Sequence, residues 1–339
     1  MNRRSKSLVS PVLVGVLLLG IVGHAPAEEP TGDPKPAELV ERVRLAISRS
    51  LPFIESDGVG WIQEKKCMSC HHTSFMIWSH EQAAQSGFEI DLKKLEGWKD
   101  WAIGQQLSKR DDDDDLVGSR NVEGLSQLIL ARSELAVPKP ARDASFEKFR
   151  ELIEAARKDD GSWAAGGQLP TQKRPKPETG EVTTMWAMLA LAAIKEGEPP
   201  NDRPLNWLRA SKIESGKSTE WHVVRLLMEK KFGDEAGQRK ALQKLLGRQN
   251  ADGGWSWVEG DASDALATGQ ALYGLGVADL PAVHPAARRG LEFLLVSQGE
   301  DGSWAVNSTK EKKRDKAIDT SVFWGTAWAT IGMLKTVNE

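Results

Sequence analysis

The sequence predicts an all-α fold in which about six helical hairpins form an inner and an outer ring of helices. Three observations predict it. A short motif of Asp, Gly and Trp recurs along the chain. Each copy stands between two stretches with helical periodicity, and the second stretch is apolar on nearly every face. With 40% apolar and 27% charged residues, the chain has the composition of a globular protein with a sizeable core.

The Asp-Gly-x-Trp motif stands at 159–163, 252–255 and 301–304, with a weaker copy at 57–61. Glycine supplies the positive φ that ends an outer helix. Tryptophan brings a large apolar surface and one N–H that can pin the loop between helices. We therefore expect these segments to be structural joints. The alternative is that their indole rings form an aromatic platform for a substrate.

The stretches that follow the motif align with one another. Their shared starting position lies at Thr73, Asn121, Thr184, Thr219, Thr268 and Thr326. The mean spacing is about 50 residues, which is the length of two helices and two loops. Each interval therefore predicts one helical hairpin.

The two helices of each hairpin differ in polarity. Residues 286–297 alternate charged and leucine positions, so that helix has one face in water. The stretch 185–194 is apolar nearly all round and must be covered on every side. Small residues such as Gly274 and Gly332 allow inner helices to approach closely. Outer helices in water around buried inner helices favour a closed ring, and an open solenoid with polar end caps is the alternative.

Two of the repeats resemble a known sequence pattern. Residues 289–304 resemble the QW repeat of squalene–hopene and other triterpene cyclases, and 240–255 resemble a second copy. That superfamily, which includes the protein prenyltransferase β-subunits, has the α/α toroid fold. The resemblance implies that Gln249 and Gln298 cap helix ends and that the tryptophan of each repeat stacks on its glutamine. Triterpene cyclases carry two such helical domains, whereas this chain has room for one.

An unbroken run of five aspartates, 111–115, formally contains the Asp-x-Asp-Asp acid motif of class II terpene cyclases. In that resemblance Asp114 is the acid that protonates an alkene, with Asp112 and Asp115 completing the motif. Such an acid must be kept neutral by burial or hydrogen bonds. Five adjacent carboxylates are more typical of a solvated loop, and a weak cation site is a further alternative.

The only two cysteines lie in the segment Cys67-Met68-Ser69-Cys70-His71, which matches the c-type haem attachment motif. Two thiols one helical turn apart can form thioethers with the two vinyl groups of one porphyrin, and the next histidine then reaches the iron. We predict one covalent haem c on Cys67 and Cys70, with His71 as the proximal iron ligand. A disulfide, or a zinc or iron site that also uses His72, remains open.

The repeat alignment places this motif in the loop that leads into the first inner helix, at one rim of the ring. His222 begins the fourth inner helix, which a six-fold ring places opposite, so it is a candidate distal ligand. A single buried histidine is more often a core residue. Met76 and His80 on the first inner helix, and Met185 and Met228, are weaker candidates. An open sixth position is equally compatible with the sequence.

The first residues predict a secretion signal at 1–27. A basic start precedes an apolar run at 12–23, and small residues follow at 25–27. The apolar run is short for a membrane span, although a retained anchor is the alternative. We expect a linker at 28–36, the toroid domain at 37–336, and export to the periplasm or the exterior.

Two functional hypotheses follow. Net charge is −3, and no basic stripe suggests nucleic acid. The first hypothesis is an electron-transfer or redox-linked haem protein, with a redox partner protein possible. The second is a toroid enzyme or binding module that holds a hydrophobic or carbohydrate ligand. In the second, the aromatic residues of the inner helices line the cavity, namely Trp186, Trp221, Phe323, Trp324 and Trp328. The sequence leaves open whether the protein is an enzyme.

Overall fold

The computed structural model describes residues 36–66, 72–110, 113–133, 144–167, 169–194, 202–313 and 315–337. These residues belong to one compact unit, Pro36–Glu339. The described residues form twelve α-helices and a single two-stranded sheet, which confirms the predicted all-α class. None of these helices has the length and apolar character that crossing a membrane requires. The predicted signal at 1–27 lies outside the described residues.

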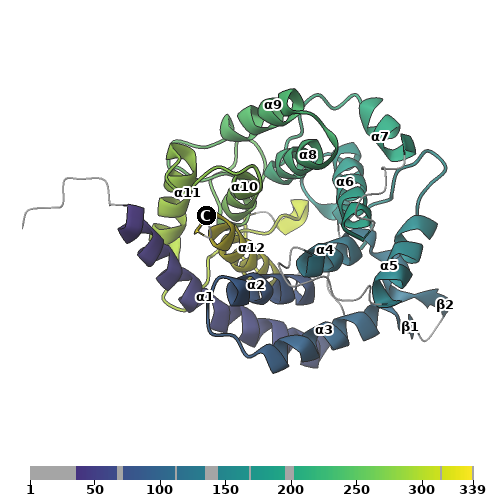
Figure 1. Cartoon of the computed structure of the whole chain (residues 1–339), viewed down its shortest axis with the longest axis horizontal. Helices are drawn as coiled ribbons and strands as arrows, with labels where there is room; N and C mark the ends of the chain where they lie inside the picture. Colours follow the sequence, from purple (N-terminus) through teal and green to yellow (C-terminus); the bar gives the residue numbers. More distant parts are fainter. Residues whose placement is uncertain are drawn as a thin grey trace, which may run out of the picture. The chain divides into compact units, whose positions relative to one another are not determined.

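Six of the described helices form the inner ring. They are α2 (Thr73–Gln85), α4 (Val122–Ser133), α6 (Lys176–Ile194), α8 (Thr219–Phe232), α10 (Ala265–Val277) and α12 (Asp319–Val337). Each packs against the next, and α12 packs against α2 (Figure 1). The ring is therefore closed, as predicted, and the open solenoid is excluded.

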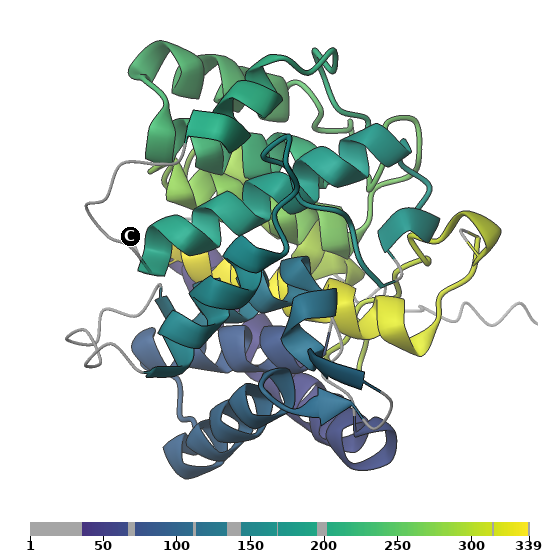
Figure 2. The same cartoon turned by 90° about the vertical axis from the view of Figure 1, so that its right-hand side faces the viewer.

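The outer helices precede their inner partners along the chain. They are α1 (Pro36–Lys65), α3 (Leu92–Gln106), α5 (Ala144–Ala155), α7 (Asp202–Arg209), α9 (Glu235–Leu246) and α11 (Pro285–Ser297). Helix α11 buries Leu291 and Leu294 and exposes Val296, so only one of its faces joins the core. In the side view, the segment that leads into α12, drawn in yellow, projects at one end of the ring (Figure 2).

The three Asp-Gly-x-Trp segments are structural joints, as expected. In each, the indole N–H donates to the backbone carbonyl ten residues earlier, and the backbone N–H of the tryptophan donates to the aligned threonine Oγ1. The sets are Trp163 with Ile153 and Thr184, Trp255 with Leu245 and Thr268, and Trp304 with Leu294 and Thr326. All three indoles are at most 1% exposed, so they belong to the core and form no platform.

The last joint in the sequence closes the outer ring. Gln298 Nε2 donates to the carbonyl of Ala46 in α1 at 2.9 Å and to that of Gly302 at 3.0 Å. Gly302 has φ +83°, and a Cβ placed on it would lie 2.1 Å from the carbonyl oxygen of Arg49. Gln249 makes the equivalent bonds from the previous joint to α11. These glutamines therefore bridge a loop to the next outer helix, and Gln298 also occupies the C-cap position of α11.

Two expectations need correction. The weaker motif copy at 57–61 is no joint, because α1 continues through it to Lys65 and Trp61 stacks on His72 instead. The second correction concerns the aspartate run, which was expected to be a solvated loop. Part of it forms strand β2 (Asp113–Leu116), which pairs antiparallel with β1 (Lys109–Arg110). Asp115 is exposed, as expected of a solvated carboxylate, whereas Asp111 and Asp112 lie outside the described residues.

A candidate acid site at the mouth of the ring

The first turns of α4, α8 and α12 lie at one end of the inner ring, together with two loops, 169–175 and 305–318. We call this end the mouth. Glu123 is the second residue of α4, and Glu220 is the second residue of α8. Helix N-termini carry a partial positive charge, which favours acidic side chains there. The fold therefore brings two carboxyl groups from distant parts of the sequence to the same end of the ring.

The two carboxyl groups have different surroundings. Glu220 is 1% exposed and accepts hydrogen bonds from Arg174 Nη1 at 2.7 Å and from Trp186 Nε1 at 3.1 Å. Glu123 is 2% exposed and accepts one from Thr183 Oγ1 at 2.8 Å. Burial, and then the negative charge of Glu220, raise the pKa of Glu123 to about 8, while Arg174 offsets only part of this. At neutral pH Glu123 is therefore protonated, beside a Glu220 that is paired with Arg174.

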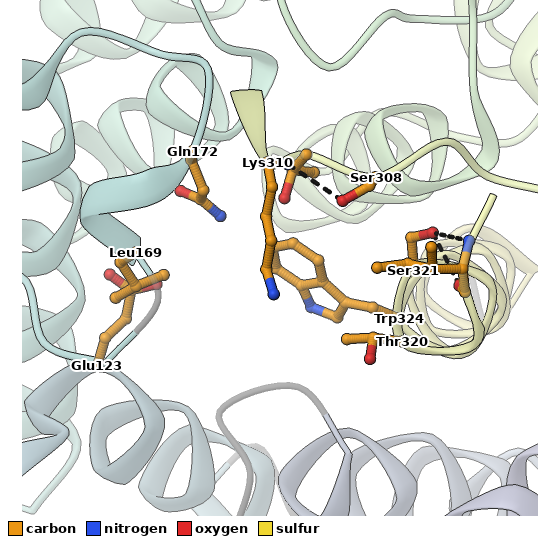
Figure 3. Close-up of a pocket in the computed structure, with 10 residues that line it drawn as sticks. Glu123, Leu169, Gln172, Ser308, Lys310, Thr320, Ser321 and Trp324 are labelled. Atoms are coloured by element: carbon orange, nitrogen blue, oxygen red, sulfur yellow. Dashed lines mark hydrogen bonds between the residues drawn. The ribbon is translucent and has the colours of Figure 1, made fainter. Parts of the chain in front are cut away.

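Glu123 lines a cavity of about 40 Å³ at the mouth. Figure 3 shows Gln172, Lys310 and Trp324 around the same space. One water molecule needs about 10–15 Å³ on this measure, whereas sites for whole small molecules usually measure about 300–1,000 Å³. The cavity thus has room for a single functional group of a ligand.

Two loops meet at this cavity. Gln172 and Lys310 form an antiparallel bridge, and the backbone N–H of Lys173 donates to the carbonyl of Thr309 at 2.9 Å. Side chains from both loops line the cavity. A ligand larger than one functional group therefore requires the two loops to part.

The axis of the ring is packed with aromatic side chains. The ring centroid of Trp328 lies 5.2 Å from Phe75, 5.5 Å from Trp78 and 5.6 Å from Tyr273. Trp186 is 6.4 Å away, and both tryptophans are fully buried. The predicted cavity along the axis is therefore filled, and two of its five expected lining residues are core residues.

The other three expected lining residues have separate positions. Trp324 does line the cavity at the mouth. Phe323 stacks on the imidazole of His72 at 4.3 Å between ring centroids. Trp221 donates its indole N–H to Glu181 at 2.6 Å, away from the cavity. Of the five predicted residues, only Trp324 lines the cavity, while Trp186 reaches the candidate site through its hydrogen bond to Glu220.

The predicted haem motif, Cys67 to His71, lies outside the described residues. Its flanks are described: α1 ends at Lys65 and α2 begins at Thr73, so the motif falls between these two helices in the sequence. His72 is 1% exposed and lies between Trp61 and Phe323, with interplanar angles of 15° to both. Burial lowers the pKa of His72, although Asp57, 3.3 Å from its Nε2, acts in the opposite direction.

The predicted distal ligand His222 is 3% exposed, and its Nε2 lies 3.0 Å from the carbonyl of Gly216. Burial lowers its pKa to about 4. His80 also has a backbone hydrogen-bond partner, since its Nδ1 lies 2.9 Å from the carbonyl oxygen of Met76. An iron ligand would use the other nitrogen of either ring or give up these bonds. The described residues contain no group of three or more His, Cys, Asp or Glu suited to a metal ion. The haem ligands stay a prediction.

A larger hollow of about 560 Å³ lies on the outer wall, between α1 and the segment that joins α2 to α3. Two of its three acidic side chains already have partners, and the third, Glu89, is exposed. Glu55 accepts from Lys94 at 2.7 Å, and Asp91 accepts from two backbone N–H groups as the N-cap of α3. We therefore place the candidate site at the mouth, where a protonated carboxyl lines the cavity.

The sequence reasoning missed the residues of the mouth. The only acid motif that the sequence offered was the formal match in the aspartate run, and no pattern pointed to Glu123, Glu220 or Arg174. One signal was present: a glutamate occupies the second position of two inner helices that are otherwise covered on every side. A carboxyl buried near such a helix start is a functional candidate, because burial perturbs its pKa.

Comparisons with known proteins support the fold. No family model matches the sequence. Squalene–hopene cyclase of Bradyrhizobium diazoefficiens is 28% identical over 200 residues, which cover 48% of this chain and 30% of that protein. The matched part thus spans less than a third of the curated relative's length.

Solved structures extend the similarity to nearly the whole chain. A possible member of the GH105 family from Salmonella enterica has a TM-score of 0.59 at 13% identity, covering 95% of this chain and 99% of that one. A type II terpene cyclase from Scytonema has a TM-score of 0.58 at 11% identity, covering 90% and 99%. A family 88 glycosyl hydrolase from Bacteroides vulgatus has 0.59 at 11%, covering 88% and 99%. At such low identity these similarities establish the α/α toroid fold alone.

Proposed function

We propose that this protein is a toroid enzyme in which Glu123 donates a proton to an oxygen atom of a ligand bound at the mouth. The observation that carries the proposal is the unequal pair of carboxyl groups. Glu220 forms a buried ion pair with Arg174, whereas Glu123 has only the hydroxyl of Thr183 as a partner among the described residues. Two neighbouring acids driven to different protonation states are a recurrent arrangement for general acid–base catalysis.

The strength of the acid favours one class of ligand. A carboxyl with a pKa of about 8 keeps its proton at neutral pH, so it is available to a leaving oxygen. The same value makes it a weak acid for protonating the carbon of an alkene. A carbohydrate or another oxygen-rich ligand therefore fits Glu123 better than a bare hydrocarbon. Both glycosidases and terpene cyclases occur among the proteins that share this fold, so the fold permits either chemistry.

The direct test is turnover by the variant E123Q, which keeps the size and hydrogen-bonding capacity of the side chain but carries no acidic proton. Wild-type protein is incubated with a panel of aryl glycosides, neutral and acidic. We expect hydrolysis of at least one, with kcat lowered by about 100-fold or more in E123Q. The control E235Q changes an exposed glutamate of α9 and should retain the full rate. Equal rates for wild type and E123Q, or no hydrolysis of any substrate, would refute the proposal.

A second proposal concerns the segment Cys67 to His71. We propose that it carries one covalent haem c, that His71 is an iron ligand, and that the protein is exported and takes part in electron transfer. The attachment motif supports this, as does the position of its flanks. His72, which follows it, touches Phe323, and the next residue, Trp324, lines the mouth cavity.

The haem proposal predicts a spectrum. Full-length protein produced with a c-haem maturation system should show a Soret band that survives acid–acetone extraction. The double variant Cys67→Ala, Cys70→Ala should lose the band and keep its helical circular dichroism. Replacement of His222 by alanine should change the spin state if that residue is the distal ligand. The absence of a band in the wild type, together with no free thiol, would instead assign the cysteines to a disulfide.

A further inference from the structure

The mouth cavity contains a positive charge that no described acid neutralises. Lys310 lines the cavity, and Figure 3 shows its side chain extending into the space beside Trp324. Its ammonium forms no ion pair with any residue that the structure describes. Glu123 is uncharged at neutral pH, and Glu220 is already paired with Arg174. The local charge is therefore positive, although the whole chain carries −3.

Arg174 adds unused donors to the same end of the ring. Its side chain is fully buried, and Nη1 donates to Glu220, while Nε and Nη2 have no partner among the described residues. These two N–H groups form one edge of the guanidinium, the edge that binds a carboxylate or phosphate through two hydrogen bonds. Buried donors without an acceptor are destabilising, so an acceptor is expected beside this edge of the guanidinium. Gln172, two residues earlier, lines the cavity, whereas Arg174 itself lies behind its lining.

The size of the cavity limits what can occupy it. About 40 Å³ holds a few water molecules or a single small polar group, and it excludes a whole sugar ring or isoprenoid chain. Thr320 and Ser321, in the first turn of α12, complete one wall. The positive end of this helix acts in the same direction as Lys310. The positive charge of Lys310 and the small volume of the cavity thus favour the same kind of group, a small anionic one.

We infer that the mouth binds an anionic group, a carboxylate or a phosphate, that belongs to the ligand of this protein. Lys310, whose side chain extends into the cavity, is its charge partner. The inference rests on the proposed function in one respect: it names the substrate class, an acidic ligand whose remaining part extends between the two loops. The binding itself needs no proton transfer.

The test measures the binding of small probes to the full chain by ligand-observed NMR. Acetate and inorganic phosphate represent the two groups, and acetamide is a neutral probe with the shape of acetate. We expect at least one anion to bind in the millimolar range, and acetamide at least tenfold more weakly. Lys310→Met and Lys310→Gln should each weaken anion binding at least tenfold. Lys312→Met, which removes an exposed neighbouring lysine, should leave it unchanged.

Several results would overturn the inference: binding of neither anion, equal affinity for acetate and acetamide, or full anion affinity in both folded Lys310 variants. An equal loss in Lys312→Met would show adventitious ion binding only. E123Q separates this inference from the proposed function, since its side chain is also uncharged and should keep anion affinity. Anion binding in a protein without turnover would remove the proposed function alone, whereas turnover without anion binding would remove the inference alone.

Discussion

Gly302→Ala should lower the free energy of unfolding by about 3 kcal/mol or more. Two effects combine at this position. The backbone has φ +83°, which strains any residue with a Cβ, and the added Cβ would lie 2.1 Å from the carbonyl oxygen of Arg49. Because that neighbour is backbone in the middle of α1, it cannot rotate away. The measurement is the urea midpoint followed by helical circular dichroism.

Gly260→Ala is the matched control. Gly260 has φ +91° but no atom within 4 Å of its Cβ position, so alanine there meets only the backbone strain of about 1–2 kcal/mol. The difference between the two variants measures the contact that joins the last repeat to the first helix. An equal loss of stability in both would show that this contact contributes nothing and that α1 is held by other means.

The wild-type protein should lose stability as pH rises from about 5 to about 8, relative to E123Q. Burial and the charge of Glu220 raise the pKa of Glu123 from 4.5 to about 8. Between these values the folded carboxyl keeps its proton while the unfolded chain has lost it, so folding takes up a proton and a rise in pH opposes it. The effect is on the order of a few kcal/mol across this range. Below the pKa of Glu123 in the unfolded chain, both states are protonated and this effect on stability disappears.

Urea unfolding of both proteins at several pH values tests this. Asp264, whose pKa burial raises to about 6, adds a change in the same direction. The difference between E123Q and wild type removes such shared contributions. We expect E123Q to gain stability over the wild type steadily up to about pH 8 and to remain level above it. Parallel curves for the two proteins would mean that Glu123 titrates as an ordinary glutamate.

The repeat pattern predicted the parts of the fold that depend on local sequence. The alignment of Thr184, Thr268 and Thr326 is confirmed at single-residue precision. Each threonine hydroxyl accepts a hydrogen bond from the backbone N–H of the tryptophan in its own repeat. The same pattern failed at 57–61. There the Asp-Gly dipeptide lies inside helix α1, whose helical periodicity continues on both sides of it. The indole of Trp61 stacks on the imidazole of His72 instead of closing a joint.

The candidate site could not be predicted in the same way. Glu123, Arg174 and Lys310 lie far apart in the sequence and meet only because the ring closes and two loops pair at its mouth. No spacing rule links them. The aspartate run drew attention because it matched a motif, yet Asp115 is exposed and pairs with Arg120 at 3.6 Å. Burial, which decides whether a carboxyl keeps its proton, is not visible in a five-residue pattern.

The pKa of Glu123 is the most direct test of the site. The side-chain carboxyl ¹³C shift of the wild type is followed by NMR against pH, and the signal missing from E123Q identifies Glu123. The account predicts a titration midpoint near 8. A midpoint between 4 and 5 would contradict it, because Glu123 would then be a carboxylate at neutral pH and could not serve as the proton donor at the mouth.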